Sequence, residues 1–339
     1  MHAVVLVGGF GTRLRPLTYT IPKPMLTVGN EPIITRLLRR LERAGVTTVT
    51  LALGFLPDPF KEAFPADRCG DVQLRYAVEP EPLDTAGAIR FAAEFGGVDG
   101  TFLALNGDNL TDLDFAVLAA AHRRLGAEAT LHLTAVGDTS AFGVVELDDA
   151  GRVLRFLEKP APGTTDSKLI NAGSYVLEPS VLDEIPPGVP VNIERVTFPA
   201  LAERGTLFGF ATDDYWTGAD NPELLRQANL DRLAGRFDTV LPNPVSGGDG
   251  VDPDAQIALS ALVSGSVVAG DVSVGARSVV TRSVLLAGSE VGEDVVVQDS
   301  VVMGRVPDGA KLSGAVIGAD AQIRPGQQVT NERIPPPAD

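Results

Sequence analysis

Short apolar runs alternate with segments of helical periodicity through the first two thirds of the chain. The first run, His2 to Val7, is mostly apolar and leads into glycines, which is typical of a buried parallel strand. Apolar residues then follow helical spacing at Ile33, Ile34, Leu37, Leu38 and Leu41. Asn30 can cap this helix, Pro32 is tolerated in its first turn, and Gly45 ends it.

The same alternation continues along the chain. We expect further strands at 46–53, 101–105 and 129–136, and helices at 85–95 and 114–125. Strands that alternate with helices predict a mostly parallel sheet with helices on both faces, joined by right-handed crossovers. The first part of the chain is therefore predicted to be a Rossmann-like α/β domain, which binds ligands at the carboxyl ends of its strands.

The pattern changes after Val251, where short valine-rich runs alternate with glycine, serine and aspartate. Ser266-Val267-Val268, Ser283-Val284-Leu285 and Ser300-Val301-Val302 recur 17 residues apart. A coil of left-handed parallel β-helix takes about three hexapeptides, each with an inward aliphatic residue, so the repeat predicts stacked coils. An antiparallel sandwich is the alternative. The predicted domains are an α/β domain at 1–237, a Pro- and Gly-rich linker at 238–250, and the β-helix at 251–339.

Composition and charge narrow the classes of partner. Hydrophobic residues make up 44% of the chain, yet no stretch approaches the about 18 consecutive apolar residues of a membrane span. The net charge of −16 disfavours binding to nucleic acid or to an anionic membrane, because either needs a basic face. No basic region precedes the first apolar run, so we expect a cytoplasmic protein without a secretory signal. The single cysteine, Cys69, excludes an intramolecular disulfide and a cysteine metal cluster.

A glycine-rich, basic loop follows the first strand. Its glycines are Gly8, Gly9 and Gly11, and its basic residues are Arg13, Arg15 and Lys23. Glycines allow positive φ and let successive backbone N–H groups converge on an anion, and the fixed positive charge suits a polyphosphate. A dinucleotide fingerprint needs a glycine where Leu14 stands, and a P-loop needs Gly-Lys-Ser/Thr after four spacers, so neither fits.

Residues 8–24 resemble the signature of sugar-1-phosphate nucleotidyltransferases, the pyrophosphorylases that make nucleotide sugars. The resemblance implies that a sugar-1-phosphate oxygen attacks the α-phosphorus of a nucleoside triphosphate and that pyrophosphate leaves in line. It implies nucleotide-binding roles for Gly8, Gly9, Gly11 and Thr12. By the same resemblance, Arg13 would hold the leaving phosphates and Lys23 the reacting phosphates.

The segment from Glu79 to Gly87 is similar to the family segment that wraps the nucleotide base. By position, Glu79 would face the Watson–Crick edge, where a carboxylate can accept from the N1–H and amino group of guanine. This favours GTP. Asp84 stands where the family usually has glycine, and Asp84 and Thr85 are expected to bind the nucleotide. The alternative is that these residues form only a solvated loop and helix N-terminus.

Asp108 follows the predicted strand at 101–105 and would lie near the glycine loop. An aspartate there suits Mg²⁺, which prefers one or two carboxylates together with phosphates and waters, and the family's metal aspartate occupies this place. In the family, the aspartate two residues after Trp216 is the second metal ligand, but this chain has Gly218. Asp220 could substitute only if the loop backbone were rearranged.

Three later motifs resemble the family's sugar-phosphate side. Carried over by position, Gly143 and Asn171 would contact sugar hydroxyls, Glu158 would hold a diol, and Lys159 would bind the sugar phosphate. A Glu-Lys pair is otherwise a common solvated surface pair. The order and spacing of the motifs favour the functional interpretation.

The C-terminal repeat resembles the β-helix of the GDP-mannose pyrophosphorylase branch, so GTP with mannose-1-phosphate is the favoured substrate pair. Other nucleotidyltransferase substrates remain open: ATP or UTP with glucose-1-phosphate, or a cyclitol phosphate. A non-catalytic, nucleotide-sugar-binding regulatory subunit is the alternative from another class. The β-helix would otherwise expose the edge of its last coil, so it is expected to mediate homo-oligomerisation.

Overall fold

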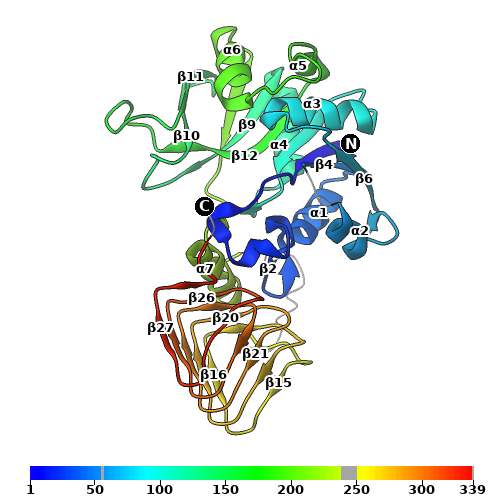
Figure 1. Cartoon of the computed structure of the whole chain (residues 1–339). Coiled ribbons are helices and arrows are strands. Elements are labelled where there is room, and N and C mark those ends of the chain that lie inside the picture. The colour runs from blue at the N-terminus through cyan, green and yellow to red at the C-terminus, as the bar shows by residue number, and fades with distance from the viewer. Residues whose placement is uncertain (55–56, 238–249, 338–339) are drawn as a thin grey trace. The chain divides into compact units, whose positions relative to one another are not determined.

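The apolar runs of the α/β part form one ten-stranded sheet in the computed structural model, which describes residues 1–54, 57–237 and 250–337 (Figure 1). The strands are β1 (His2–Leu6), β4 (Thr48–Leu53), β5 (Arg68–Cys69), β6 (Val72–Val78), β7 (Phe102–Asn106), β9 (Ala129–Ala135), β10 (Gly143–Leu147), β11 (Val153–Glu158), β12 (Leu169–Leu177) and β13 (Leu207–Ala211). Its main path runs β11-β10-β12-β7-β1-β4-β6-β5. Strands β7, β1, β4 and β6 are parallel, whereas β12 pairs antiparallel with β7.

The α/β class is therefore confirmed, with a sheet that is mixed rather than uniform in direction. The helices are α1 (Ile33–Arg43), α2 (Asp58–Ala63), α3 (Asp84–Gly96), α4 (Phe115–Leu125), α5 (Pro179–Asp183), α6 (Phe198–Glu203) and α7 (Pro222–Leu233). Helix α3 contacts β1, β4 and β6, and α4 contacts β9 and β13. None of the helices in the described ranges is long and apolar enough to cross a membrane.

One predicted helix start is wrong. Asn30 does not cap α1, because Glu31–Pro32 forms strand β3, which pairs with β2 (Thr27–Val28) before the helix begins at Ile33. Asn30 instead lies in the tight turn between these two strands, with φ of 64°. Aspartate and asparagine tolerate this left-handed conformation, so the same residue type serves a turn here and not a cap.

The chain divides into two compact units that are each built from distant segments. The first comprises Met1–Gly9 and Ile34–Trp216, and the second comprises Phe10–Ile33 and Thr217–Asp339. The predicted boundaries at 237 and 250 differ from this division, because the glycine-rich loop after Gly9 groups with the C-terminal repeat. The predicted linker lies outside the described residues except for Gly250.

The C-terminal repeat forms the predicted parallel β-helix, and not an antiparallel sandwich. Three parallel sheets stack its coils, in the orders β15-β18-β21-β24, β16-β19-β22-β25-β27 and β17-β20-β23-β26-β28. Their bounds are β15 Gln256–Ile257, β16 Leu262–Ser264, β17 Val267–Val268, β18 Ser273–Val274, β19 Val279–Thr281, β20 Val284–Leu285, β21 Glu290–Val291, β22 Val296–Gln298, β23 Val301–Val302, β24 Arg305–Val306, β25 Lys311–Ser313, β26 Val316–Ile317, β27 Gln328–Thr330 and β28 Arg333–Ile334. Inward aliphatic side chains such as Val280 and Val297 fill the coil interior.

Residues 10–33 are held against the coils and α7 within the second unit. The Arg333 guanidinium donates to the backbone oxygens of Arg13 (2.8 Å) and Arg15 (3.1 Å). Buried Asn229 on α7 accepts from the Gly29 N–H at 2.9 Å, and the Asn30 amide donates to the Val268 carbonyl at 3.0 Å. The backbone of the loop is thus fixed by the C-terminal half of the chain.

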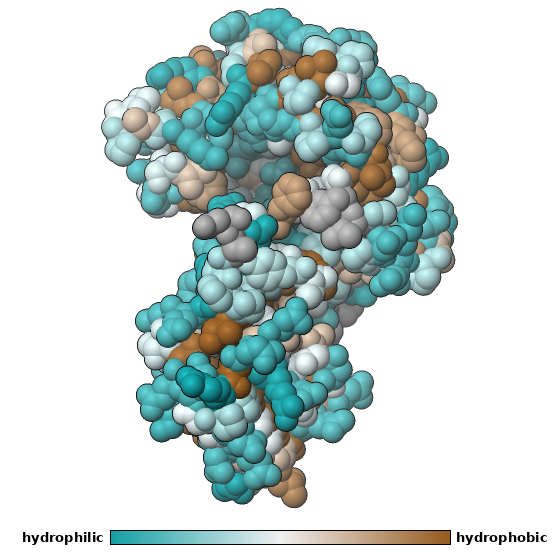
Figure 2. Space-filling view, in the orientation of Figure 1, coloured by the Kyte–Doolittle hydropathy of each residue, from teal (hydrophilic) through white to brown (hydrophobic). Residues whose placement is uncertain are grey.

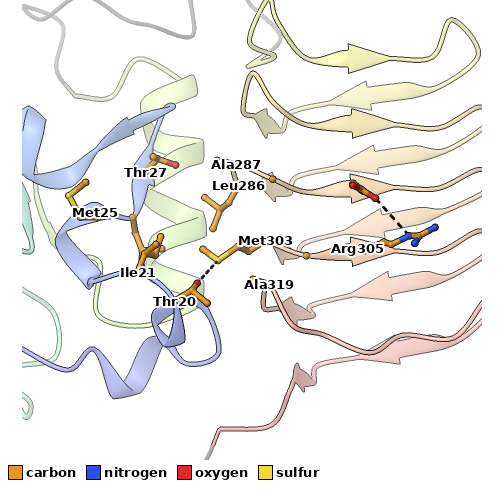
Figure 3. A pocket seen from close by; sticks show the side chains of 13 residues that line it. Thr20, Ile21, Met25, Thr27, Leu286, Ala287, Met303, Arg305 and Ala319 are labelled. Carbon is orange, nitrogen blue, oxygen red and sulfur yellow. Dashed lines mark hydrogen bonds and ion pairs between the residues drawn. The ribbon is translucent and has the colours of Figure 1, made fainter. Parts of the chain in front are cut away.

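A cavity of about 620 Å³ lies between residues 20–27 and the coils of the same unit (Figure 3). Apolar side chains such as Ile21, Leu286 and Met303 line most of it, and the Thr20 hydroxyl donates to the Met303 sulfur at 3.8 Å. On the face of the molecule in Figure 2, hydrophilic residues dominate and hydrophobic ones occur in small groups, in keeping with the acidic composition.

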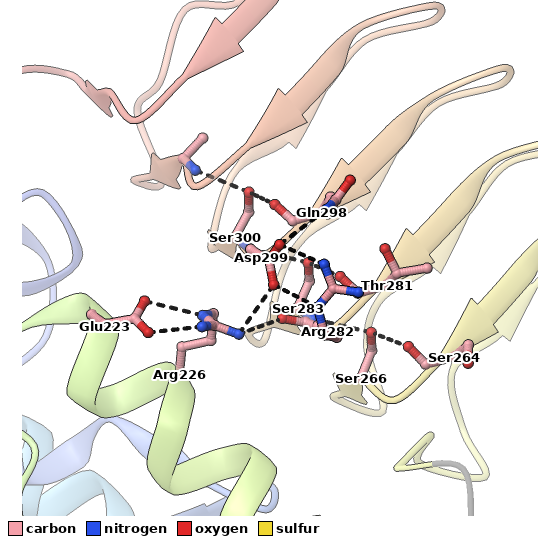
Figure 4. A network of polar contacts seen from close by, with 11 residues as sticks. Glu223, Arg226, Ser264, Ser266, Thr281, Arg282, Ser283, Gln298, Asp299 and Ser300 are labelled. Atoms are coloured by element: carbon pink, nitrogen blue, oxygen red, sulfur yellow. Dashed lines mark hydrogen bonds and ion pairs between the residues drawn. The ribbon is translucent and has the colours of Figure 1, made fainter.

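A ladder of buried serines fixes one corner of the β-helix (Figure 4). Ser266, Ser283 and Ser300 occupy the same place in successive coils. The oxygen of each accepts a backbone N–H from the next coil at 3.0–3.1 Å, and its hydroxyl donates to the carbonyl two residues earlier. The recurring serine of the sequence therefore satisfies buried backbone groups that the short strands leave unpaired.

We expect Ser283→Ala to lower the free energy of unfolding by about 1–3 kcal/mol, because it leaves the buried Ser300 N–H without its acceptor. Urea denaturation followed by circular dichroism measures this. Ser264→Ala removes an exposed serine of the preceding coil and should change stability by about 0.5 kcal/mol or less. Equal stability of the two variants would show that the ladder contributes nothing.

Candidate active site

The carboxyl ends of the parallel strands of the first unit carry three of the predicted site residues. Gly8 follows β1, Glu79 follows β6, and Asp108 lies two residues beyond β7. Because neighbouring parallel strands end at the same edge, these residues lie along the edge where open α/β sheets bind ligands. Gly9, next to Gly8, is exposed.

Close backbone approach explains two glycines at this edge. A Cβ added to Gly8 would lie 2.8 Å from the Gly54 amide nitrogen, and one added to Gly107 would lie 2.6 Å from a Val7 methyl. The Gly107 N–H also donates to the Leu6 carbonyl at 2.8 Å. The loop that carries Asp108 therefore packs directly against the end of β1.

Glu79 lies beside Gly8 and is partly desolvated. Its Oε2 accepts the Leu83 N–H at 2.9 Å, which fixes the side chain. Its Oε1 would be 3.7 Å from a Cβ on Gly8, so this second oxygen faces the start of the loop. Burial raises the pKa of the Glu79 carboxyl above its usual value. A fixed carboxylate with one oxygen toward the glycine loop can accept hydrogen bonds from a ligand there.

Asp84 and Thr85 make their side-chain contacts with a different segment. Asp84 adopts φ of 55°, the left-handed conformation for which glycine is usual and aspartate tolerated. Its Oδ1 accepts from the Thr85 N–H and from the Asn192 amide at 3.0 Å. The Thr85 hydroxyl donates to Glu194 at 3.0 Å and accepts the Ile193 N–H. These contacts brace the start of α3, and a nucleotide-binding role for both residues stays a prediction.

A cluster of polar residues surrounds the buried hydroxyl of Tyr175 on β12. Asn171 donates to this hydroxyl at 2.9 Å. Burial raises the pKa of Tyr175 well above its usual value, and the negative charges of Glu194, Glu158 and Asp108 raise it further. Asn171 therefore contacts the Tyr175 hydroxyl directly, and Glu158 and Asp108 act on it through their charge.

Glu194 is the member of this cluster that the sequence analysis missed. It lies in the single π-helical turn η4 (Ile193–Thr197), behind an Asn192 cap, and in sequence it looks like an ordinary acidic residue in a first helical turn. Burial raises the pKa of its carboxyl, and Glu158 adds to the effect.

The paired strands β10 and β11 bring three predicted sugar-side residues together: Gly143, Glu158 and Lys159. Gly143 pairs with Glu158 in register, and a Cβ added to Gly143 would lie 3.0 Å from Glu158 Oε2. The Lys159 ammonium is 3.6 Å from Glu158 Oε1, and its side chain is 58% exposed. An exposed lysine beside a shielded carboxylate can bind a phosphate without breaking a buried pair.

The second unit holds the remaining predicted residues. Gly11, with φ of 58°, precedes η1 (Thr12–Leu14), and Thr12 and Arg13 are exposed at its start. Lys23 opens η3 (Lys23–Met25) and is buried. Asp220 Oδ1 lies 2.6 Å from the Lys23 ammonium and 3.2 Å from the Arg13 guanidinium. The carboxylate considered as a substitute metal ligand therefore pairs with two cations.

The donor set for a metal is small. In the described parts of the chain, no group of three or more histidine, cysteine, aspartate and glutamate side chains is arranged to hold a metal ion. Gly218, at the end of β14 (Trp216–Gly218), is buried and offers no ligand. Of the predicted ligands, Asp108 remains compatible with Mg²⁺, which accepts a single carboxylate when phosphates and waters complete its coordination.

Comparison with known proteins identifies the family of the chain. A family model described as nucleotidyl transferase matches residues 2–233. The mannose-1-phosphate guanylyltransferase of Mycobacterium tuberculosis is 41% identical over 246 residues, which cover 72% of this chain and 67% of that protein. The mannose-1-phosphate guanyltransferase of Aspergillus fumigatus is 40% identical over 269 residues, which cover 76% of this chain and 73% of that protein.

Solved structures show the same fold. HddC from Yersinia pseudotuberculosis, complexed with GMP-PN, superposes with a TM-score of 0.58 at 28% identity, covering 67% of this chain and 97% of that one. A putative glucose-1-phosphate thymidylyltransferase from Bacillus anthracis gives a TM-score of 0.63 at 23% identity, covering 70% of this chain and 97% of that one. The family match, the relatives and the motifs agree, and the chain belongs to the nucleotidyl transferase family.

Proposed function

We propose that this nucleotidyltransferase condenses GTP with mannose-1-phosphate to give GDP-mannose and pyrophosphate. The observation that carries the choice of base is Glu79, a carboxylate fixed through one oxygen with the other toward the glycine loop. Guanine offers donors on its Watson–Crick edge where adenine offers an acceptor at N1, so a carboxylate there favours guanine. The names of the Mycobacterium and Aspergillus relatives described above support the same substrates.

In the proposed reaction an oxygen of the sugar phosphate attacks the α-phosphorus, and pyrophosphate leaves in line. No protein nucleophile is needed, so catalysis consists of positioning and of neutralising phosphate charge. Arg13 holds the leaving phosphates, Lys23 the reacting phosphates, and Lys159 the phosphate of the sugar. Glu158, Asn171 and the backbone at Gly143 read the sugar hydroxyls.

Mg²⁺ is the proposed cofactor, held by Asp108 together with phosphate oxygens. When bound, it would neutralise phosphate charge in the transition state. With Gly218 in place of a second carboxylate, most of its coordination falls to phosphates and water. We therefore expect a half-maximal rate only at unusually high Mg²⁺.

Purified protein assayed for pyrophosphate release across four nucleoside triphosphates and several sugar-1-phosphates tests the function. GTP with mannose-1-phosphate should give the highest kcat/KM. Nucleotide binding without turnover for every pair would favour the regulatory subunit instead. A cytoplasmic location stays a prediction from the sequence.

We expect Glu79→Gln to reduce the preference for GTP over ATP by about 1–3 kcal/mol, the scale of one charge-assisted hydrogen bond. The ratio of kcat/KM values for the two nucleotides measures it. Because the pKa of Glu79 is raised, acidification should protonate it before an ordinary glutamate and reduce the same preference. Glu81→Gln, at an exposed site two residues later, is the matched control. An unmodified protein that prefers ATP or UTP would refute the assignment.

We expect Asp108→Asn to lower kcat by about 10²-fold or more, because the amide keeps the shape of the side chain but loses the charge that holds the cation. Steady-state rates at saturating Mg²⁺ measure the effect. Asp149→Asn, at an exposed turn of the same unit, should leave the rate unchanged. Near-normal turnover of Asp108→Asn would remove Asp108 from the metal site.

The β-helix is proposed to mediate self-association. Leu262, Val279 and Val296 align on adjacent strands in one row of an outer face, and Leu262 is 58% exposed. The row continues into Lys311 and Gln328, so its apolar end is distinct. An exposed apolar row on a sheet is a common basis of interfaces between copies.

We expect the full-length protein to be oligomeric at micromolar concentration and Leu262→Asp to shift it to monomer, because the charge would be buried in the interface. Light scattering after size exclusion reports the mass. Gln328→Asp, at the polar end of the same row, should leave the assembly intact. A strictly monomeric full-length protein would contradict this use of the β-helix.

A further inference from the structure

Asp220 forms a charge cluster with two cations in the second unit. Its Oδ1 is 2.6 Å from the Lys23 ammonium and 3.2 Å from the Arg13 guanidinium. The two cations differ sharply in environment, because the Lys23 side chain is 7% exposed and the Arg13 side chain 70% exposed. The same carboxylate thus contacts one buried and one solvated cation of the glycine-rich loop.

Rigid backbone flanks both partners of the buried pair. Lys23 lies between Pro22 and Pro24, which restrict its backbone. The Asp220 N–H donates to the Gly218 carbonyl at 2.7 Å, and the next residue, Asn221, caps α7 by accepting the Leu224 N–H. The contact therefore joins two fixed points and is not a chance meeting of flexible chains.

Because Lys23 is buried and Arg13 is exposed, their two contacts with Asp220 differ in strength. A buried ammonium is costly without an anion, so the Lys23 pair persists once formed. An exposed pair contributes little, so Arg13 can leave Asp220 for a phosphate at small cost. A divalent cation, by contrast, would meet two positive charges already placed at Oδ1, which disfavours metal binding there.

We propose that Asp220 is a positioning residue, which fixes the ammonium of Lys23 for the reacting phosphates. Asp220 also pairs with the guanidinium of Arg13 until nucleotide binds and takes its place. This role rests on the proposed function, since the phosphates that Lys23 and Arg13 meet are those of the nucleotide and the sugar phosphate. Asp220 acts through Lys23 and touches no substrate, and it is not a metal ligand.

The test compares Asp220→Asn, which keeps shape and loses charge, with Asp220→Glu, which keeps charge. We expect Asp220→Asn to lower kcat by about 10- to 100-fold through a misplaced ammonium, with KM for GTP unchanged or lower because Arg13 is released. The Mg²⁺ concentration for half-maximal rate should not change. Asp220→Glu should recover a large part of kcat. Asp213→Asn, at an exposed carboxylate between β13 and β14, is the matched control.

A double-mutant cycle with Lys23 distinguishes a positioning role of Asp220 from a purely structural one. In a Lys23→Met background, Asp220→Asn should lower kcat no further, whereas two independent effects would multiply. A thermal unfolding midpoint for each variant identifies any that fails to fold. Should Lys23→Met fail to fold, the split between kcat and KM in Asp220→Asn and its recovery in Asp220→Glu decide the question.

Several outcomes overturn the proposal. A rise of about tenfold or more in the Mg²⁺ requirement of Asp220→Asn, corrected by added Mg²⁺, would make Asp220 a metal ligand. A higher kcat would make the pair inhibitory, and kinetics equal to wild type would make it irrelevant. The unchanged protein tests the proposed function separately: if it is active and Asp220→Asn equals it, the positioning role alone fails, whereas an inactive unchanged protein overturns both.

Discussion

A buried ammonium needs an anion, and this need connects two distant parts of the chain. Lys23 lies in the segment that follows the first strand, and Asp220 comes 197 residues later, directly before α7. Their contact holds residues 10–33 with the C-terminal segment, as the division into two units reflects. The pair of Lys23 and Asp220 is thus one of the contacts that join residues 10–33 to the C-terminal segment.

The β-helix contributes to this arrangement through backbone contacts. Arg333 from its last strand holds the carbonyls of Arg13 and Arg15, and Arg226 of α7 donates to the Arg282 carbonyl between coils (Figure 4). Coils stacked by parallel strands and a buried serine ladder form a stiff platform. The repeat supplies none of the predicted catalytic side chains, yet it fixes the backbone from which Arg13 projects.

The sequence predicted the elements whose signal is local. The buried strands and helices α3 and α4 follow from apolar periodicity, and the 17-residue repeat predicted the β-helix. Strand β6 was not among the predicted strands, although its burial pattern alternates as in a half-buried strand. The sequence could not predict the role of Glu194, the partners of Asp220 or the two-segment units. Each of these depends on which distant residues meet in space.

The two departures from the family's pattern have different physical consequences. Asp84 replaces a glycine at a left-handed backbone position, and its carboxylate satisfies neighbouring donors there, so the local conformation is kept at little cost. Gly218 and Asp220 together change the charge distribution, because a carboxylate is missing at one position and present two residues on, paired with Lys23 and Arg13. The first departure preserves the local backbone shape, whereas the second places a carboxylate beside Lys23 and Arg13, the two cations predicted to bind phosphate.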